Sequence, residues 1–159
     1  WFQGRAEFGP RALGNRSILA NPQISEMKDV LNSKVKFRES FRPFAPAVIE
    51  GEAKKYFEIE TNSPYMLLTA KVKPKYQKLL PAITHIDGTA RVQTVTPNQN
   101  QRFWKLLYEF GKISGTPVIL NTSLNVKGEP IVNTPEDAVK SFLETGIDVL
   151  VIRNLVVEK

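Results

Sequence analysis

The chain contains no cysteine and a single histidine, His85, among its 159 residues. The lack of cysteine excludes a disulfide framework, a cysteine-based zinc site and a thiol nucleophile, and it is compatible with a reducing cytosol. A turn or structural role is the favoured interpretation of the lone histidine. Carboxylates are not clustered densely enough to predict a magnesium site built from protein side chains alone. We expect a cytoplasmic protein that holds no metal of its own.

Long hydrophobic runs are also missing. Runs such as Ala45–Ile49 and Val149–Ile152 are far too short to cross a membrane, which takes about 20 apolar residues, and the N-terminus lacks a signal-peptide pattern. A hydrophobic fraction of 42% still suffices for a core, and 159 residues fit one domain. The chain starts at Trp1 rather than methionine, which suggests a piece of a longer polypeptide.

Arginine, by contrast, is concentrated near the start. Five of the eight arginines lie in two loops rich in glycine or proline, GRAEFGPRALGNRS at 4–17 and KVKFRESFRPFAP at 34–46. Such loops hold guanidinium and backbone N–H groups in fixed directions, so they predict a site for phosphate or carboxylate. The net charge of +6 agrees with attraction to phosphorylated molecules or polyanions, although the scattered lysines are equally compatible with a merely soluble surface.

Helical and strand-like segments alternate along the sequence. The clearest helix has an apolar stripe of Phe103, Leu106, Leu107 and Phe110 and a stop at Gly115. We expect helices at 22–33, 51–57, 75–80, 99–114 and 135–145, and strands at 45–49, 65–72, 89–96, 118–120 and 148–152. This order predicts one α/β domain over residues 1–159 with a mixed, open, twisted sheet and flanking helices.

Two further segments carry candidate site residues. The loop predicted at 121–130 begins with NTSLN, where open α/β sheets place their ligands, although these residues are also ordinary turn formers. Arg91 lies within a predicted strand; if it faces the arginine loops it must be matched to an anion, because an unpaired buried charge is costly. The segment 111–114, GKIS, lies in a predicted helix and lacks the upstream glycine of a Walker loop, so an NTPase of that class is not expected.

Four segments in this order resemble the C-terminal part of the O-carbamoyltransferases of the nodulation and antibiotic-tailoring type, whose last domain is similar to the YrdC/Sua5 fold. The segments are GRAEFGPRALGNRSILANP, FRPFAPAV, HIDGTARVQTV and PVILNTSLNVKGEPIVNTPEDA. The tripeptides Lys36-Phe37-Arg38 and Ser123-Leu124-Asn125 also resemble the K-x-R and S-x-N signature of YrdC-like proteins, and each is weak by itself.

The resemblance implies one domain of a two-domain enzyme. The YrdC-like domain would form carbamoyl adenylate from carbamoyl phosphate and ATP with Mg²⁺. A preceding kinase-like domain, holding Fe²⁺ or a similar metal, would transfer the carbamoyl group to a hydroxyl of a small-molecule acceptor. Neither a membrane nor a specific nucleic acid is an expected partner. Motif position implies catalytic roles for Lys36, Arg42, Arg91 and Ser123, and binding roles for Arg11 and Asn121 and, in second rank, for Arg5, Arg38 and Asn125.

Three alternatives stay open at this point. Phe37, Phe41 and Phe44 lie between basic residues, which is compatible with an RNA-binding YrdC-like module, although RRM signatures are lacking. A threonylcarbamoyl adenylate synthase-like enzyme is the second alternative, but the GPRALG and DGTARVQ segments favour the O-carbamoyltransferase group. The third is an inert structural domain.

Overall fold

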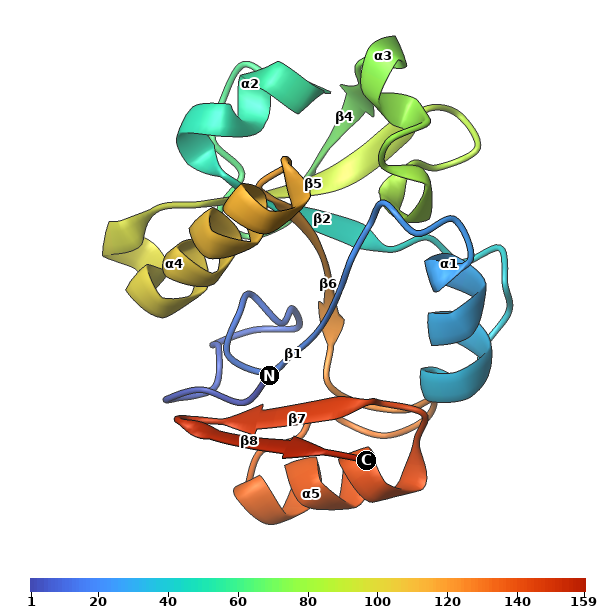
Figure 1. Cartoon of the computed structure of the whole chain (residues 1–159), viewed down its shortest axis with the longest axis vertical. Helices are drawn as coiled ribbons and strands as arrows, with labels where there is room; N and C mark the ends of the chain where they lie inside the picture. Colours follow the sequence, from blue (N-terminus) through green and yellow to red (C-terminus); the bar gives the residue numbers. More distant parts are fainter.

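The computed structural model describes all 159 residues and contains one open six-stranded sheet (Figure 1). Only β2 and β5 are parallel neighbours, and the other pairs are antiparallel. The predicted α/β fold with a mixed open sheet is confirmed. Across the sheet the strands are β1 (Ser17–Ala20), β6 (Val118–Ser123), β2 (Ala45–Ile49), β5 (Thr89–Val95), β4 (Leu68–Val72) and β3 (Phe57–Glu58).

Helices cover the sheet unequally. The helix α4 (Pro97–Ser114) packs Phe103 and Leu107 against one face, whereas a larger core fills the other face. Successive strand residues point to opposite faces, so Ala47 contacts α4 and Val48 enters the larger core. The remaining helices are short: α1 (Met27–Val30) with the π-helical turn η1 (Leu31–Val35), η2 (Glu50–Glu52), α2 (Ala53–Tyr56), α3 (Pro74–Gln77), η3 (Pro81–Ile83) and α5 (Pro135–Glu144). None of the helices is both long and apolar enough to span a membrane.

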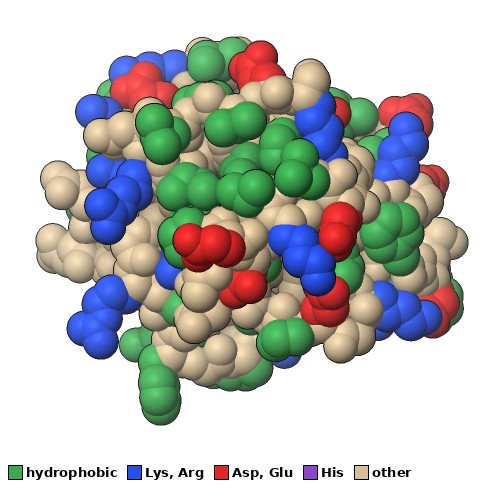
Figure 2. Space-filling view, turned by 90° about the horizontal axis from the view of Figure 1, so that it is seen from below, with side chains coloured by type: hydrophobic (Ala, Val, Ile, Leu, Met, Phe, Trp, Pro, Cys, Tyr) green, Lys and Arg blue, Asp and Glu red, His purple; other side chains and the backbone are tan.

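A second, two-stranded sheet consists of β7 (Val149–Ile152) and β8 (Leu155–Glu158). Residues 1–3 join it to the main sheet: the Phe2 N–H donates to Val151 O of β7 at 2.8 Å on one side, and the Ser17 N–H of β1 donates to Trp1 O at 3.1 Å on the other. Figure 2 shows the molecule from below, the side on which α5 and this hairpin lie in Figure 1.

A carboxylate within the first arginine loop and residues at the start of the chain hold this loop in place. The Glu7 carboxylate accepts the backbone N–H groups of Leu13 and Asn15 at 2.6 and 2.7 Å. Arg16 is buried with its guanidinium 3.5 Å from the Phe2 ring centroid, and it donates to backbone carbonyls, among them Gln3 O at 2.8 Å. Arg16 therefore fastens the start of the chain and is unavailable to a ligand.

The predicted elements differ from the observed ones mainly at their ends. The predicted strand 65–72 begins only at Leu68, because Met66 adopts φ 55° and donates its N–H to Ser63 O in a turn. The predicted helix 22–33 begins at Met27 and continues to Val35 as a π turn, whose Lys36 N–H reaches Leu31 O. The short strands β1, β3 and β8 were not expected from the sequence.

The largest difference concerns Asn121, Thr122 and Ser123. The sequence predicts a loop from Asn121 onward, but all three residues lie in β6. Asn121 pairs with Leu19 of β1 and with Ala45 of β2, so strand pairing on both sides outweighs the turn preference of these residue types.

Gly14 is needed where the first loop crosses α4. Its φ is 111°, and a Cβ there would lie 2.3 Å from Phe103 Cδ1. Gly14→Ala should therefore lower the unfolding free energy by roughly 2–4 kcal/mol, from the clash and the unfavourable φ together, as measured by urea unfolding. Gly9→Ala is the matched control, since its φ is 124° and nothing lies within 4 Å of the added Cβ. Equal losses in both variants would show that the contact with Phe103 contributes nothing.

Candidate active site

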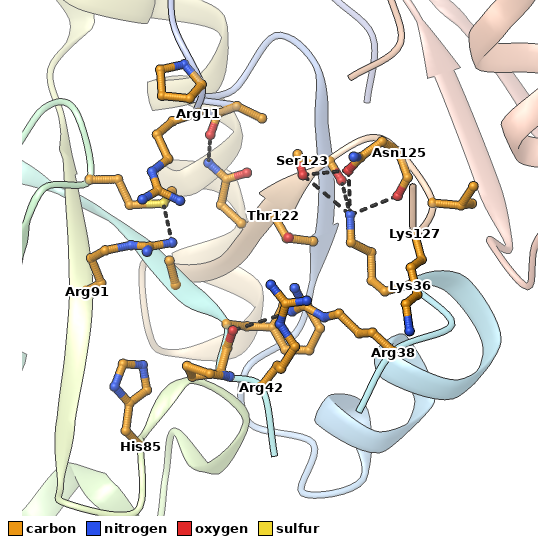
Figure 3. A pocket seen from close by; sticks show the side chains of 18 of the residues that line it. Arg11, Lys36, Arg38, Arg42, His85, Arg91, Thr122, Ser123, Asn125 and Lys127 are labelled. Atoms are coloured by element: carbon orange, nitrogen blue, oxygen red, sulfur yellow. Dashed lines mark hydrogen bonds between the residues drawn. The ribbon is translucent and has the colours of Figure 1, made fainter. Parts of the chain in front are cut away.

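A cavity of about 490 Å³ opens between the two arginine loops, β5 and the end of β6 (Figure 3). No aspartate or glutamate lines it. The basic residues that line it come from four separate segments of the chain and are Arg11, Lys36, Arg38, Arg42, Arg91 and Lys127. A cavity with this many cations and no carboxylate is a site for an anion.

Lys36 lies in a cage of neutral oxygens. Lys36 comes directly after η1 in the sequence, and the residue is only 5% exposed. Its Nζ donates to Ser123 O at 2.9 Å and to Asn125 O and Oδ1 at 2.8 and 2.7 Å, with Ser123 Oγ further away at 3.4 Å (Figure 3). The K-x-R and S-x-N tripeptides, far apart in sequence, therefore meet through this ammonium group.

The cage fixes Lys36 without neutralising it. Burial, followed by the nearby charges of Arg38 and Arg42, lowers the pKa of Lys36 to about 7. Ser123 donates its hydroxyl to Asn125 Oδ1 at 2.6 Å, and its oxygen accepts from Lys36 Nζ at 3.4 Å, so the hydroxyl hydrogen points away from the amine. Ser123 is thus placed to orient Lys36 and a ligand rather than to act as a nucleophile.

Arg38 is positioned by Asn32 and Phe44. Its Nε donates to Asn32 Oδ1 at 2.8 Å, and its guanidinium carbon lies 4.7 Å from the Phe44 ring centroid. The buried Asn32 amide also donates to the carbonyls of Ser40 and Arg42 and so shapes the second loop. Burial and then Arg42 lower the pKa of Arg38, while Glu39 opposes this shift.

Arg91 points from β5 into the cavity and so faces the arginine loops, the case in which the sequence calls for a matching anion. Its Nη2 donates to Met66 Sδ at 3.8 Å, and its Nε is buried without a partner. Arg11 also has a buried Nε without a partner. Burial, and then the charge of Arg11, lower the pKa of Arg91. These two guanidinium groups repel one another with no carboxylate between them, so an anion is the missing partner.

Among the residues that line the cavity, Asn121 alone has a buried acceptor atom without a hydrogen-bond partner. It is 1% exposed, and its Nδ2 donates to Ala12 O at 3.2 Å and to Gln93 Oε1 at 2.7 Å. Because Ala12 O can only accept, this contact fixes which end of the amide is nitrogen. The Asn121 Oδ1 is buried without a donor in a residue that lines the cavity. A buried carbonyl oxygen of this kind calls for an N–H or O–H group on the ligand.

One predicted site residue lies elsewhere. Arg5 is exposed and does not line the cavity, because its part of the first loop turns outward and only its carbonyl is engaged, by Asn15 Nδ2 at 2.9 Å. The other predicted residues all line the cavity, namely Arg11, Lys36, Arg38, Arg42, Arg91, Asn121, Ser123 and Asn125.

The cavity also contains residues that the sequence did not single out for it. Lys127 and Met66 line it, and no local pattern marks them, whereas Thr122, which also lines it, belongs to the NTSLN segment that the sequence indicated. His85 lines it too, while its Nδ1 lies 3.2 Å from Thr89 Oγ1 in the turn that the sequence indicated. Burial lowers the pKa of His85, which favours a neutral ring beside the cations.

The aromatic residues of the second loop separate into two kinds. Phe44 is buried beneath Arg38 and is not free to stack on a base, whereas Phe37 and Phe41 are exposed and lie outside the cavity lining. An aromatic platform of the kind that binds single-stranded RNA is not assembled here.

Comparison with known proteins places these features in a family context. The whole chain, residues 1–159, matches the family model described as carbamoyltransferase C-terminus. It is 49% identical over 162 residues to nodulation protein NolNO of Sinorhizobium fredii and 48% identical over 162 residues to nodulation protein NolO of Bradyrhizobium diazoefficiens. Both matches cover 100% of this chain but only 24% and 30% of the relatives. The chain thus spans less than a third of the length of these relatives.

Lys36 should make the unfolding free energy depend on pH. Its folded pKa of about 7 lies below the ordinary 10.5, so between these values the unfolded chain binds more protons and the unfolding free energy rises with pH. The slope due to Lys36 should approach about 1.4 kcal/mol per pH unit. Urea unfolding between about pH 6 and about pH 9 measures it against Lys36→Met, which removes this titration. Parallel curves for the two proteins would contradict the low pKa.

Proposed function

The chain belongs to the carbamoyltransferase C-terminus family, and we propose that its cavity joins carbamoyl phosphate and MgATP to form carbamoyl adenylate, the first half-reaction of an O-carbamoyltransferase. One observation carries this proposal: the cavity combines six basic side chains, no carboxylate and one buried carbonyl oxygen without a donor. An anion alone matches the basic residues, but an anion that also bears an N–H group matches all three features.

The basic residues suit phosphorylated substrates. Guanidinium forks bind phosphate oxygens in pairs, as Arg11, Arg42 and Arg91 would, whereas Lys36 acts as a point charge. The volume of about 490 Å³ lies within the range of about 300–1,000 Å³ for small-molecule sites. Magnesium enters with the nucleotide and is held by phosphate oxygens and water, which agrees with a lining that has no carboxylate.

Asn121 suits the carbamoyl group. The NH₂ of a carbamoyl or carbamate ligand donates to Asn121 Oδ1 and satisfies the buried acceptor. Inorganic phosphate offers no N–H group, and acetyl phosphate presents a methyl group at the same place. Asn121 would therefore select the carbamoyl group, and the basic residues would bind the phosphate attached to it.

The reaction needs charge stabilisation more than proton transfer. Water cleaves carbamoyl phosphate to carbamate and hydrogen phosphate, and the proton that water loses passes to solvent. A carbamate oxygen then bonds to the α-phosphorus of ATP while the bond to the β-phosphate oxygen breaks, and pyrophosphate leaves. Negative charge that develops on these oxygens meets guanidinium groups already held in place, so little reorganisation is required. The carbamate is anionic and needs no general base.

The second half-reaction is assigned to polypeptide beyond the described residues. The relatives are more than three times as long as the matched region, which leaves room for a kinase-like domain that transfers the carbamoyl group to a hydroxyl. The same proposal assigns Fe²⁺ or a similar metal to that kinase-like domain and not to the basic cavity.

The proposal is tested by incubating the protein with ATP, Mg²⁺ and either carbamoyl phosphate or acetyl phosphate. Carbamoyl phosphate should give pyrophosphate and carbamoyl adenylate, detected by mass spectrometry. Acetyl phosphate should bind roughly 10- to 100-fold more weakly, since it leaves the Asn121 oxygen unsatisfied. Absence of carbamoyl adenylate from protein that carries out carbamoyl transfer would overturn the proposed intermediate, and equal affinity for both acyl phosphates would overturn the role of Asn121.

Arg42→Ala should lower the rate of adenylate formation by roughly 100-fold, because it removes a charge-assisted contact to phosphate. Folding should be almost unchanged, since the Arg42 side chain is exposed and its backbone bonds to Asn32 and Glu39 persist. The control is Lys78→Ala, which removes an exposed positive charge away from the cavity and should change little. If Arg42→Ala lowers the melting temperature enough for unfolding to explain the lost activity, the role of Arg42 is structural.

A further inference from the structure

The lower face of the molecule, made by α5 and the β7–β8 hairpin, exposes apolar side chains. Figure 2 shows hydrophobic side chains gathered on this face. Leu155 of β8 is 70% exposed and Leu143 of α5 is 66% exposed. Val156 and Val157 of β8 and Val139 of α5 are also exposed. Leu155 and Val157 point to one face of the hairpin and Val156 to the other, while Val139 and Leu143 follow one side of α5.

The edge of β8 has no partner. This strand pairs only with β7, so its outer N–H and C=O groups are unpaired in the sheet. Proteins normally protect such an edge with charged side chains, proline, a bulge or a covering segment, yet three of the four residues of β8 are Leu-Val-Val and Glu158 is its single charge. Lys159 does not protect it, because its Nζ donates to the carbonyls of Phe142 and Thr145 at the end of α5.

An apolar cavity of about 240 Å³ lies beside this face. All eleven residues that line it are hydrophobic, among them Trp1, Leu106, Phe142 and Val149. None of them lines the basic cavity. The face is thus separate from the anion site and chemically unlike it.

The C-terminus lies at this face, and the N-terminus lies along the other edge of β7, next to β1. Figure 1 shows the N and C marks beside the β7–β8 hairpin, and residues 1–3 hydrogen-bond along β7. The relatives carry much more polypeptide than the matched region. Polypeptide that continues from the C-terminus leaves the domain at this face, and polypeptide that precedes Trp1 leaves it beside β7. A segment tethered at either point reaches the face at an effective concentration of about millimolar.

We propose that the additional part of the same polypeptide packs on this face, covering the β8 edge and the exposed side of α5. The attachment buries the apolar side chains and pairs the free strand edge, while the basic cavity stays open to its ligands. This packing follows from the exposed apolar face and the free edge of β8, and it does not depend on the reaction in the basic cavity.

Hydrogen exchange measured by mass spectrometry on the protein as its gene encodes it tests this inference. Amides at 155–158 should exchange roughly 100-fold more slowly than a free strand edge allows. Replacing Leu155 and Val157 together by lysine should remove that protection while residues 103–110 of α4 stay protected, which shows that the domain remains folded. The control is Ile113→Lys, at an exposed position on α4, and it should leave the protection at 155–158 unchanged.

Three results would overturn the inference. The first is fast exchange at 155–158 in the unaltered protein. The second is protection that appears only as the protein concentration rises, which would identify a second copy of the chain as the occupant. The third is an encoded polypeptide that contains nothing beyond these 159 residues.

Discussion

Positive charge in a cavity that no carboxylate lines is the constraint on which the rest of this structure depends; the nearest compensation is Glu39 outside the lining, 3.7 Å from Lys127 Nζ. Four arginines and two lysines converge on one cavity, and the contacts of Lys36, Arg38 and Arg91 are neutral oxygens, a methionine sulfur and an aromatic ring. Each neutral contact fixes a direction but supplies no opposite charge. Burial, and then repulsion between the cations, lowers the pKa values of Lys36, Arg38 and Arg91, so the cavity is completed only by an anion.

The scaffold holds these charges together against their repulsion. Asn121 of β6 and Gln93 of β5 lie on the two strands that flank β2. Their side-chain amides donate to the first loop, Asn121 to Ala12 O and Gln93 to Leu13 O. The Asn32 amide holds the second loop by donating to the carbonyls of Ser40 and Arg42. Buried amides suit this task, because they bind backbone groups without carrying charge. Strand pairing on both sides of β6 carries Asn121 and Ser123 into position, so the mixed sheet itself determines the shape of the cavity.

Much of this organisation follows from the sequence, and the exceptions have physical causes. The four ordered segments predict the family, and the fold class and the long helix α4 with its Gly115 stop are confirmed. Glycine and proline in the loops predict an anion site but not the direction of each arginine: Arg5 turns outward, and Arg16 binds backbone carbonyls. Lys127 and Met66 join the cavity through tertiary packing, which no local pattern encodes.

Proton uptake on ligand binding tests the uncompensated charge most directly. At about pH 8 the low pKa of Lys36 leaves most of the side chain neutral, and carbamoyl phosphate is already a dianion. Binding of that dianion should raise the pKa of Lys36 and draw in close to one proton per site. Calorimetric titrations in two buffers of different ionisation enthalpy measure this number. An uptake between about 0.5 and 1 proton is the predicted result, and binding without proton uptake would contradict the account.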